Sequence, residues 1–172
     1  TQFGVEAIGT KDPRIDAEVI ALAMGLYAEL GIKQLRLEIN SVGCHECRPK
    51  HREALINHLK QFEQELPEED RNRLERNPLR VLDSKNPKTQ ELTKDAPSIL
   101  EYLCSDCQTH FEGLQKHLTN IGIPFVVNPR MVRGLDYYTQ TAFEIISEHI
   151  GAIGTVCGGG RYNGLVADIG GQ

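Results

Sequence analysis

Residues 131–139, Met-Val-Arg-Gly-Leu-Asp-Tyr-Tyr-Thr, place a cation, a carboxylate and two phenols close together. The guanidinium of Arg133 stays charged and offers a planar set of donors, which suits a phosphate whose negative charge grows during displacement. The hydroxyls of Tyr137 and Tyr138 can bind a small polar ligand. Because side chains alternate along a strand, both tyrosines face one pocket only if the strand bends, for example at a bulge beside Gly134. On chemistry alone, a surface arginine and two core tyrosines are the simpler explanation.

Two other groups of residues could line a ligand site. Gly158, Gly159 and Gly160 let a ligand approach the backbone closely, although three glycines also make an ordinary hairpin exit. Their spacing matches neither the P-loop nor the dinucleotide fingerprint, so nucleotide binding of those two kinds is not expected. Gln2 and Glu6 would point to the same face of an extended strand. Without further support, two polar surface residues are the simpler explanation of so short a pair.

Four of the five cysteines form two Cys-x-x-Cys pairs, made of Cys44, Cys47, Cys104 and Cys107. The spacing within each pair is that of a Cys₄ zinc site, but the gap of 56 residues between the pairs exceeds that of a compact zinc ribbon. A helical hairpin would bring them together, with His51 and His110 as spare ligands. Reduced surface thiols explain the pairs equally well. A redox motif is disfavoured, because neither pair opens a helix after a strand. Cys157 is predicted to be a small buried side chain.

Basic residues outnumber acidic ones between positions 71 and 88. The six basic residues are Arg71, Arg73, Arg76, Arg80, Lys85 and Lys88, against Glu75 and Asp83. Such a cluster is a candidate surface for phosphate groups, although a solvated helix face and loop is the simpler explanation.

Hydrophobic periodicity predicts the elements that must position these residues. Asp12 and Pro13 offer a cap and a first helical position, and apolar residues then recur on one helical face up to Gly31. Alternation over 35–40 predicts a strand with one buried face. The segment from Cys44 to about Asn120 has helical patterns, around Leu55, Leu59, Phe62 and around Phe111, Leu114, Leu118, and no clear strand. Strands are predicted at 123–127, 137–147 and 155–157, with a hairpin turn over 151–154.

Composition narrows the class of protein. A chain of 172 residues with 40% hydrophobic content can form one ordinary domain, or a core with a small satellite. A formal charge of −5 argues against a protein that coats nucleic acid by bulk electrostatics. No apolar run approaches the roughly 18 residues of a membrane span, and no signal pattern is visible, so we expect a cytoplasmic protein. The chain lacks an initial Met and looks cut from a longer one.

Taken together, these stretches resemble the histidyl-tRNA synthetase family of class II aminoacyl-tRNA synthetases, essentially from end to end. Residues 2–6 look like the returning strand of the second class motif, 132–139 like the signature peculiar to the histidine enzymes, and 158–165 like their glycine-rich pocket floor. The resemblance implies an α+β fold: part of a mixed, mainly antiparallel sheet with flanking helices, interrupted by an inserted helical domain. The expected division is a partial catalytic core, 1–43 with 121–172, and an insertion over 44–120.

The resemblance also implies a chemistry and a set of partners. In this family the histidine carboxylate attacks the α-phosphate of ATP with Mg²⁺ present, and the adenylate then acylates tRNA(His). Carried over by position, Arg133 would be catalytic and would also contact histidine. The other histidine-binding residues would be Gln2 for the amino group, Glu6 and Tyr138 for the two imidazole nitrogens, and Tyr137, Gly158 and Gly159 lining the pocket. The implied partners are L-histidine, ATP and tRNA(His), in a homodimeric full-length protein with no membrane association. A structural Zn²⁺ remains an open expectation from the spacing of the cysteines alone.

The departures from the family pattern limit what the chain alone can do. It lacks the dimer-forming first motif, the half of the second motif with the ATP-binding arginine, the third motif and the anticodon-binding domain. We therefore expect no adenylate formation by this chain alone. Because the family's insertion is thought to lean on the tRNA acceptor arm, the candidate tRNA contacts are Arg71, Arg73, Arg76 and Arg80.

Two other functions compete with this hypothesis. A catalytically silent, synthetase-like regulatory subunit of histidine biosynthesis would keep the fold, but we expect such a protein to lack both the insertion and the full run at 133–138. A zinc-stabilised RNA-binding module would explain the insertion, but not Arg133 or the glycine floor.

Overall fold

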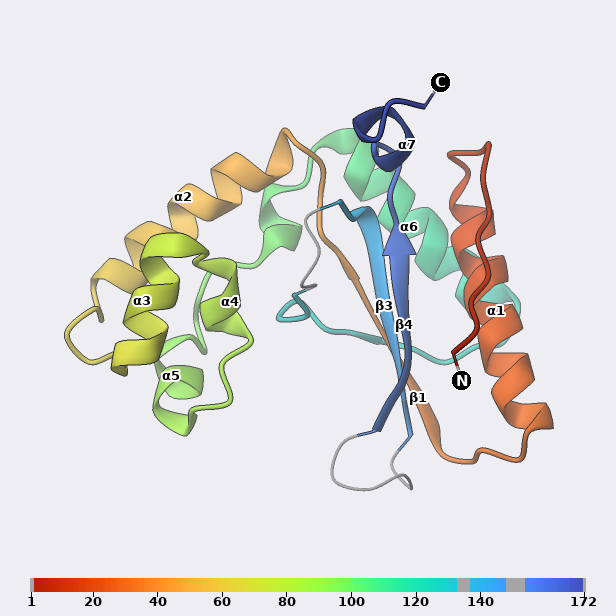
Figure 1. Ribbon diagram of the computed structural model, residues 1–172, viewed down its shortest axis with the longest axis horizontal. Helices are drawn as coiled ribbons and strands as arrows, with labels where there is room; N and C mark the ends of the chain where they lie inside the picture. The colour runs from red at the N-terminus through yellow and green to blue at the C-terminus, as the bar shows by residue number, and fades with distance from the viewer. Residues whose placement is uncertain (1, 133–136, 148–153, 172) are drawn as a thin grey trace.

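The computed structural model describes residues 2–132, 137–147 and 154–171. Their centre is a four-stranded sheet of order β2-β1-β3-β4 (Figure 1), with β1 at Leu35–Ser41, β2 at Val126–Val127, β3 at Thr139–Ser147 and β4 at Gly154–Arg161. β2 pairs with β1 in parallel, and the other two pairings are antiparallel. The fold expected from the sequence, an α+β protein with a mixed, mainly antiparallel sheet, is confirmed.

Two long helices cover one face of the sheet. The first is α1, Pro13–Glu29, which begins where the side chain of Asp12 accepts the backbone N–H of Arg14 at 2.9 Å. The second is α6, Ser105–Asn120. Their apolar faces meet alternate residues of β1 and β3 in one hydrophobic cluster, whose fully buried members are Ile20, Leu37, Ile39, Leu114, Leu118 and Ile145. The helices predicted near 13–30 and around Phe111 are confirmed by this packing.

The other face of β1 is also buried, contrary to the prediction of a strand with one solvated face. Every residue from Leu37 to Ser41 is buried. The side chain of Asn40 donates to the carbonyl of Met131 at 3.2 Å, and Glu38 accepts from the side chain of Asn128 at 2.6 Å. Polar residues are tolerated here because the loop after β2 supplies hydrogen-bond partners. Alternation of residue types reported the strand correctly but not its environment.

The segment between β1 and α6 forms a set of helices with a hydrophobic cluster of its own. They are α2 (Cys47–Lys60), α3 (Glu68–Arg76), α4 (Leu79–Leu82), α5 (Pro87–Leu92) and the 3₁₀ helix η1 (Ile99–Tyr102). The buried members of the cluster are Leu55, Leu59, Leu66, Leu74, Val81 and Leu82. In Figure 1 these helices lie to one side of the sheet, whereas α6 packs against α1 and the sheet. The division at 44 and 120 stays a prediction, and this packing associates α6 with the core.

Several local predictions differ from the structure. Only Val126 and Val127 form a strand in the segment predicted at 123–127, and β4 is longer than predicted because it includes the three glycines. The predicted turn over 151–154 lies outside the described residues except for Gly154. The strand expected at Gln2–Glu6 is absent from the described chain, because a strand needs a partner and the sheet here ends at β4. A short helix, α7 (Leu165–Asp168), follows β4.

Candidate functional site

A cavity of about 850 Å³ lies between the N-terminal segment, α1 and strands β3 and β4. It brings together five of the residues predicted to bind histidine: Gln2, Glu6, Tyr138, Gly158 and Gly159. Tyr137 does not line the cavity, but its ring centroid lies 4.8 Å from that of Tyr138 and 6.1 Å from that of Tyr162, which does line it. Arg133 lies outside the described residues. The roles assigned to these residues stay predictions.

An irregularity in β3 sets the direction of Tyr138. The register of β3 against β4 shifts between Thr139 and Ala142, and Gln140 has a φ of +55°, a conformation that side-chain-bearing residues rarely adopt. The bulge expected beside Gly134 lies outside the described residues, and the bend described at Gln140 comes after both tyrosines. It lets Tyr138, which is 8% exposed, face the cavity although β3 continues into the sheet.

Gly159 and Gly160 of β4 have a packing role. A Cβ atom at Gly159 would lie 2.8 Å from ring atoms of Phe143. At Gly160 it would lie 2.5 Å from the carbonyl oxygen of Thr141 and 2.8 Å from the ring of Tyr138. The glycines thus let β4 lie directly against the aromatic rings that border the cavity. The sequence predicted close approach at this point, and the structure identifies the neighbouring strand as one of its causes.

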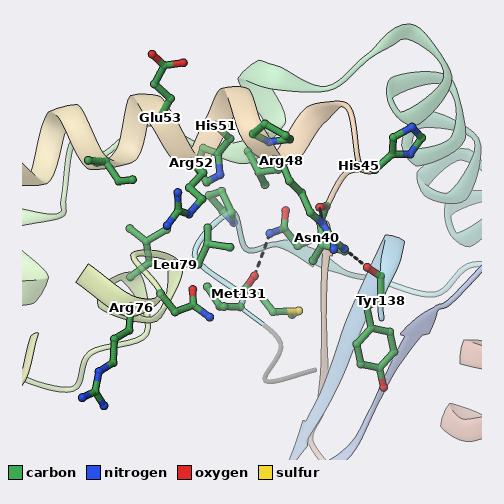
Figure 2. A pocket seen from close by; sticks show the side chains of 18 of the residues that line it. Asn40, His45, Arg48, His51, Arg52, Glu53, Arg76, Leu79, Met131 and Tyr138 are labelled. Carbon is green, nitrogen blue, oxygen red and sulfur yellow. Dashed lines mark hydrogen bonds between the residues drawn. The ribbon is translucent and has the colours of Figure 1, made fainter. Parts of the chain in front are cut away.

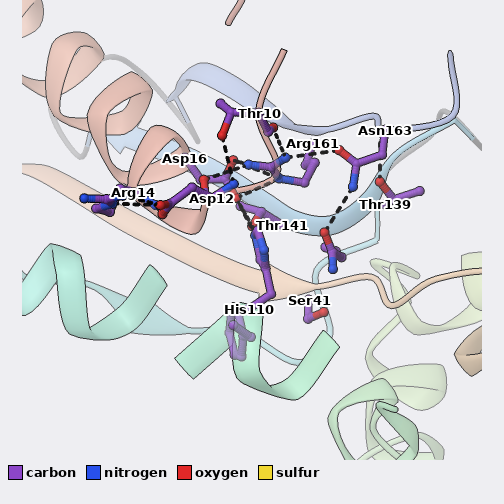
Figure 3. Close-up of polar contacts among 12 residues, drawn as sticks. Thr10, Asp12, Arg14, Asp16, Ser41, His110, Thr139, Thr141, Arg161 and Asn163 are labelled. Carbon is purple, nitrogen blue, oxygen red and sulfur yellow. Dashed lines mark hydrogen bonds and ion pairs between the residues drawn. The ribbon is translucent and has the colours of Figure 1, made fainter. Parts of the chain in front are cut away.

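Four charged or polar side chains beside the cavity form a network that the sequence did not predict (Figure 3). Asp16, in the first turn of α1, accepts hydrogen bonds from Thr141 at 2.6 Å and pairs with His110 at 2.7 Å. Arg161, at the end of β4, lies 2.8 Å from the same carboxylate. Arg161 also donates to the backbone carbonyls of Thr10 and Asp12 at 2.9 and 3.1 Å. One contact point therefore joins the N-terminal segment, α1, α6, β3 and β4.

Burial and hydrogen bonding act in opposite directions on Asp16. Burial of the carboxyl raises its pKa, but hydrogen bonds from His110, Arg161 and Thr141 outweigh it and leave the pKa below the usual value of 3.8. The carboxylate is therefore charged at neutral pH, as the ion pair with Arg161 requires.

The four paired cysteines meet at the junction of the helical segment and the sheet. Their sulfur atoms all lie within 4.8 Å of one another, with 3.5 Å between Cys44 and Cys47 and 3.8 Å between Cys44 and Cys104. A tetrahedral zinc site with Zn–S bonds of about 2.3 Å has sulfur–sulfur edges of about 3.8 Å. Cys44 follows β1 and Cys104 precedes α6, so α2 and η1 form the hairpin that closes the long gap between the pairs.

The surroundings of the cluster shift the pKa values of three of its thiols in different directions. Burial raises the pKa of Cys44, but backbone N–H groups of Cys47 and Glu46 donate to its sulfur and bring the value down to about 7. Burial raises the pKa of Cys47 and of Cys107.

The expected spare ligands are bonded elsewhere, His51 to the carbonyl of Pro97 and His110 to Asp16. The sulfur atoms alone therefore make up the cluster. Cys157 is only half-buried.

A second cavity, of about 780 Å³, lies between the helical segment and the end of β1 (Figure 2). Arg76 lines it and is exposed, and Arg80 is also exposed. Arg71 donates to the carbonyls of Glu63 and Leu66, and Arg73 pairs with Glu69 and with the buried Asp70. Among the predicted tRNA contacts, Arg71 and Arg73 are thus half-buried, whereas Arg76 and Arg80 are exposed.

No helix among the described residues combines the length and apolar character needed to cross a lipid bilayer.

Comparisons with known proteins agree along the whole chain. Residues 1–172 match the family model described as histidyl-tRNA synthetase. The histidine–tRNA ligase of Geobacillus sp. (strain WCH70) is 59% identical over 172 residues, which cover 99% of this chain and 41% of that protein. The protein of the same name from Moorella thermoacetica is 53% identical over 171 residues, 99% of this chain and 40% of that one. This chain spans about 40% of the length of such relatives.

A solved structure shows the same arrangement. The crystal structure of apo S. aureus histidyl-tRNA synthetase superposes with a TM-score of 0.72 and 40% sequence identity, over 96% of this chain and 40% of that one.

Replacing Asp16 by Asn should lower the free energy of unfolding by about 3 kcal/mol at pH 7, because Arg161 is left buried without a countercharge. A carboxyl with a depressed pKa contributes stability above its unfolded value, and that stability is lost as the pH falls through the lower folded value. The difference between wild type and variant should therefore shrink below about pH 4. Denaturant unfolding followed by circular dichroism at several pH values measures it. Asp106→Asn, an exposed change in α6, is the control, and a difference independent of pH would contradict the assignment.

Proposed function

Because this chain belongs to the histidyl-tRNA synthetase family, we propose that it is part of a histidine–tRNA ligase, which activates histidine with ATP and transfers it to tRNA(His) in protein biosynthesis. The observation that supports this proposal is the convergence of Glu6 and Tyr138, from opposite ends of the chain, on one cavity floored by glycines. The proposed parent is a cytoplasmic homodimer, and the chain alone is not expected to form the adenylate.

Within this proposal the cavity binds histidine. The imidazole ring has two nitrogens of different character, and two polar partners distinguish it from other side chains, because a wrong ligand would leave one of them unpaired. The carboxylate of Glu6 and the hydroxyl of Tyr138 would be these partners, and Gln2 would hold the amino group. Tyr137 would support Tyr138 through their ring contact. Arg133 would stabilise charge on the α-phosphate and orient the attacking carboxylate.

ATP and Mg²⁺ are proposed as cofactors of the longer protein. Among the described residues, the cysteine cluster is the one group of three or more side chains arranged to hold a metal ion, and thiolates do not suit magnesium.

The competing functions make different predictions for this cavity. A silent regulatory subunit would bind histidine without forming an adenylate, even as a full-length protein. An RNA-binding module would not bind histidine at all. Histidine-dependent exchange of pyrophosphate into ATP by the full-length protein tests the first alternative, and calorimetry with free histidine tests the second.

In the full-length protein, Glu6→Gln and Tyr138→Phe should each weaken histidine binding by about 10- to 100-fold, because each leaves an imidazole nitrogen without its partner. Isothermal titration calorimetry measures the affinity. Glu18→Gln, an exposed change on α1 away from the cavity, is the matched control and should bind like wild type. Wild-type affinity in both cavity variants would remove the proposed pocket.

We propose that the basic surface of the helical segment contacts the acceptor arm of tRNA(His). Arg71, Arg73, Arg76 and Arg80 are the candidates, and Arg76 and Arg80 are the two that are exposed. Because phosphate contacts release counterions, their number appears as the salt dependence of binding.

Changing Arg76 and Arg80 together to Glu should weaken tRNA binding by the full-length protein at low salt and reduce the slope of log affinity against log salt by about 2. Filter binding across a salt series measures both quantities. Lys116→Glu, on the exposed side of α6, is the control for a charge reversal outside this surface. Unchanged affinity in low salt would exclude this surface as a tRNA contact.

We propose that the cysteine cluster binds a structural zinc ion. The support is the near-tetrahedral spacing of the sulfur atoms and the backbone N–H of Cys104, which donates to the sulfur of Cys47 at 3.1 Å, a bond that stabilises a thiolate. Zinc would join the end of β1 to the start of α6 and so fix the helical segment at both of its ends.

The purified protein should contain about one zinc ion per chain by elemental analysis. Cys107→Ser should lose the metal and lower Tm by more than about 5 °C, whereas Cys157→Ser should keep both, since Cys157 is not part of the cluster. A metal-free wild-type protein that still has the Tm of zinc-loaded protein would contradict a structural role.

A further inference from the structure

Arg48 connects the cysteine cluster to the cavity wall. It follows Cys47 directly and lies in the first turn of α2. Its Nε donates to the carbonyl of Val42 at 3.1 Å, and its Nη2 donates to the carbonyl of Tyr138 (Figure 2). A guanidinium presents its donors in a rigid plane. The side chain of Arg48 therefore fixes the position of the end of β1 relative to the start of β3.

The backbone at this point is held on both strands. The N–H of Val42 donates to the carbonyl of Gln140 at 2.7 Å, and the N–H of Gln140 donates to the carbonyl of Gly43 at 2.8 Å. Gly43 and Gln140 both have positive φ, at +64° and +55°. A residue with a side chain keeps such a conformation only where its neighbours enforce it. The bend that directs Tyr138 into the cavity therefore depends on the turn that leaves β1.

That turn is closed by the cysteine cluster. Cys44 and Cys47 stand at its two ends with their sulfur atoms 3.5 Å apart. A Cβ atom at Gly43 would lie 2.7 Å from the Cβ of Cys47, so backbone and cluster are already in close contact. Cys47 is 1% exposed. A metal ion bound to both thiolates would fix the direction in which α2 begins, and with it the position of Arg48.

Tyr138 lies between the two cavities. It lines the histidine cavity with Glu6, and it also lines the cavity under α2 with Arg48. Its ring therefore borders the proposed histidine site, while its backbone carbonyl accepts a hydrogen bond from Arg48.

We propose that Arg48 is a positioning residue for the histidine pocket, and that a metal ion in the cysteine cluster tightens histidine binding by holding Arg48 on the carbonyl of Tyr138. This inference rests on the proposed function, since it concerns the affinity of that same pocket. It adds a long-range coupling between a structural metal and substrate affinity, carried by a connected set of covalent and hydrogen bonds.

The test is histidine affinity of the full-length protein by isothermal titration calorimetry, with zinc loaded and after chelation. Arg48→Met should raise Kd for histidine about tenfold, and Arg48→Lys, which keeps one charged donor, should raise it about threefold. Chelation should raise the wild-type Kd by a similar factor and should change that of Arg48→Met little, because the link is already broken. Arg52→Met is the matched control: Arg52 is exposed, lies one turn along α2 and lines the same cavity.

Each outcome decides a separate point. If wild type binds no histidine under any condition, the proposed function fails. If wild type binds histidine and Arg48→Met binds it equally well, the positioning role of Arg48 is overturned. If Arg48→Met weakens binding but chelation of wild type does not, the metal coupling is overturned and the positioning role stands. Zinc content and Tm identify a variant that has lost its fold; in that case Arg48→Lys carries the test, and a wild-type Kd in that variant overturns the proposal.

Discussion

Arg161 and Asp16 form an almost fully buried ion pair, and α1, α6, β3 and β4 each contribute a side chain to the contacts around it. The two side chains are 6% and 10% exposed, so neither charge can be satisfied by water if the other is removed. The pair joins the end of β4 to the first turn of α1, while Thr141 and His110 bring β3 and α6 to the same carboxylate. Through the carbonyls of Thr10 and Asp12 it also fixes the N-terminal segment, which carries Gln2 and Glu6.

A second junction lies on the other side of Tyr138. There the cysteine cluster and Arg48 hold the start of the helical segment against the end of β1. Tyr138 is thus placed between an ion-pair junction that borders the cavity lined by Glu6 and a thiol junction that lies beside its backbone. The glycines of β4 complete this arrangement, because any side chain at Gly159 or Gly160 would displace the aromatic rings. Substrate recognition, as proposed, depends on contacts that lie largely outside the cavity.

The described residues form three hydrophobic clusters, and the way they meet decides how the helical segment is held against the sheet. The cluster of α2, α3 and α4 shares no fully buried residue with the cluster of α1, α6 and the sheet. A third cluster at their junction contains Ile99 with Cys47 and Cys107, and Arg48 and the side chain of Asn40 on the loop carbonyl of Met131 add polar contacts there. The junction therefore combines apolar packing with directional hydrogen bonds.

The sequence by itself predicted α1 and α6 from helical periodicity, β1 from alternation and a strand at β3, and the motifs that resemble the family implied the α+β class. It also predicted the cysteines as a candidate site, though not that four sulfur atoms from positions 44 to 107 meet. Only the tertiary structure decided that both faces of β1 are buried, that β3 bends at Gln140, and that Asp16, His110, Thr141 and Arg161 share one contact point. The physical reason is that such contacts join residues up to 145 positions apart, and their energy depends on burial, which no local spacing of residue types encodes.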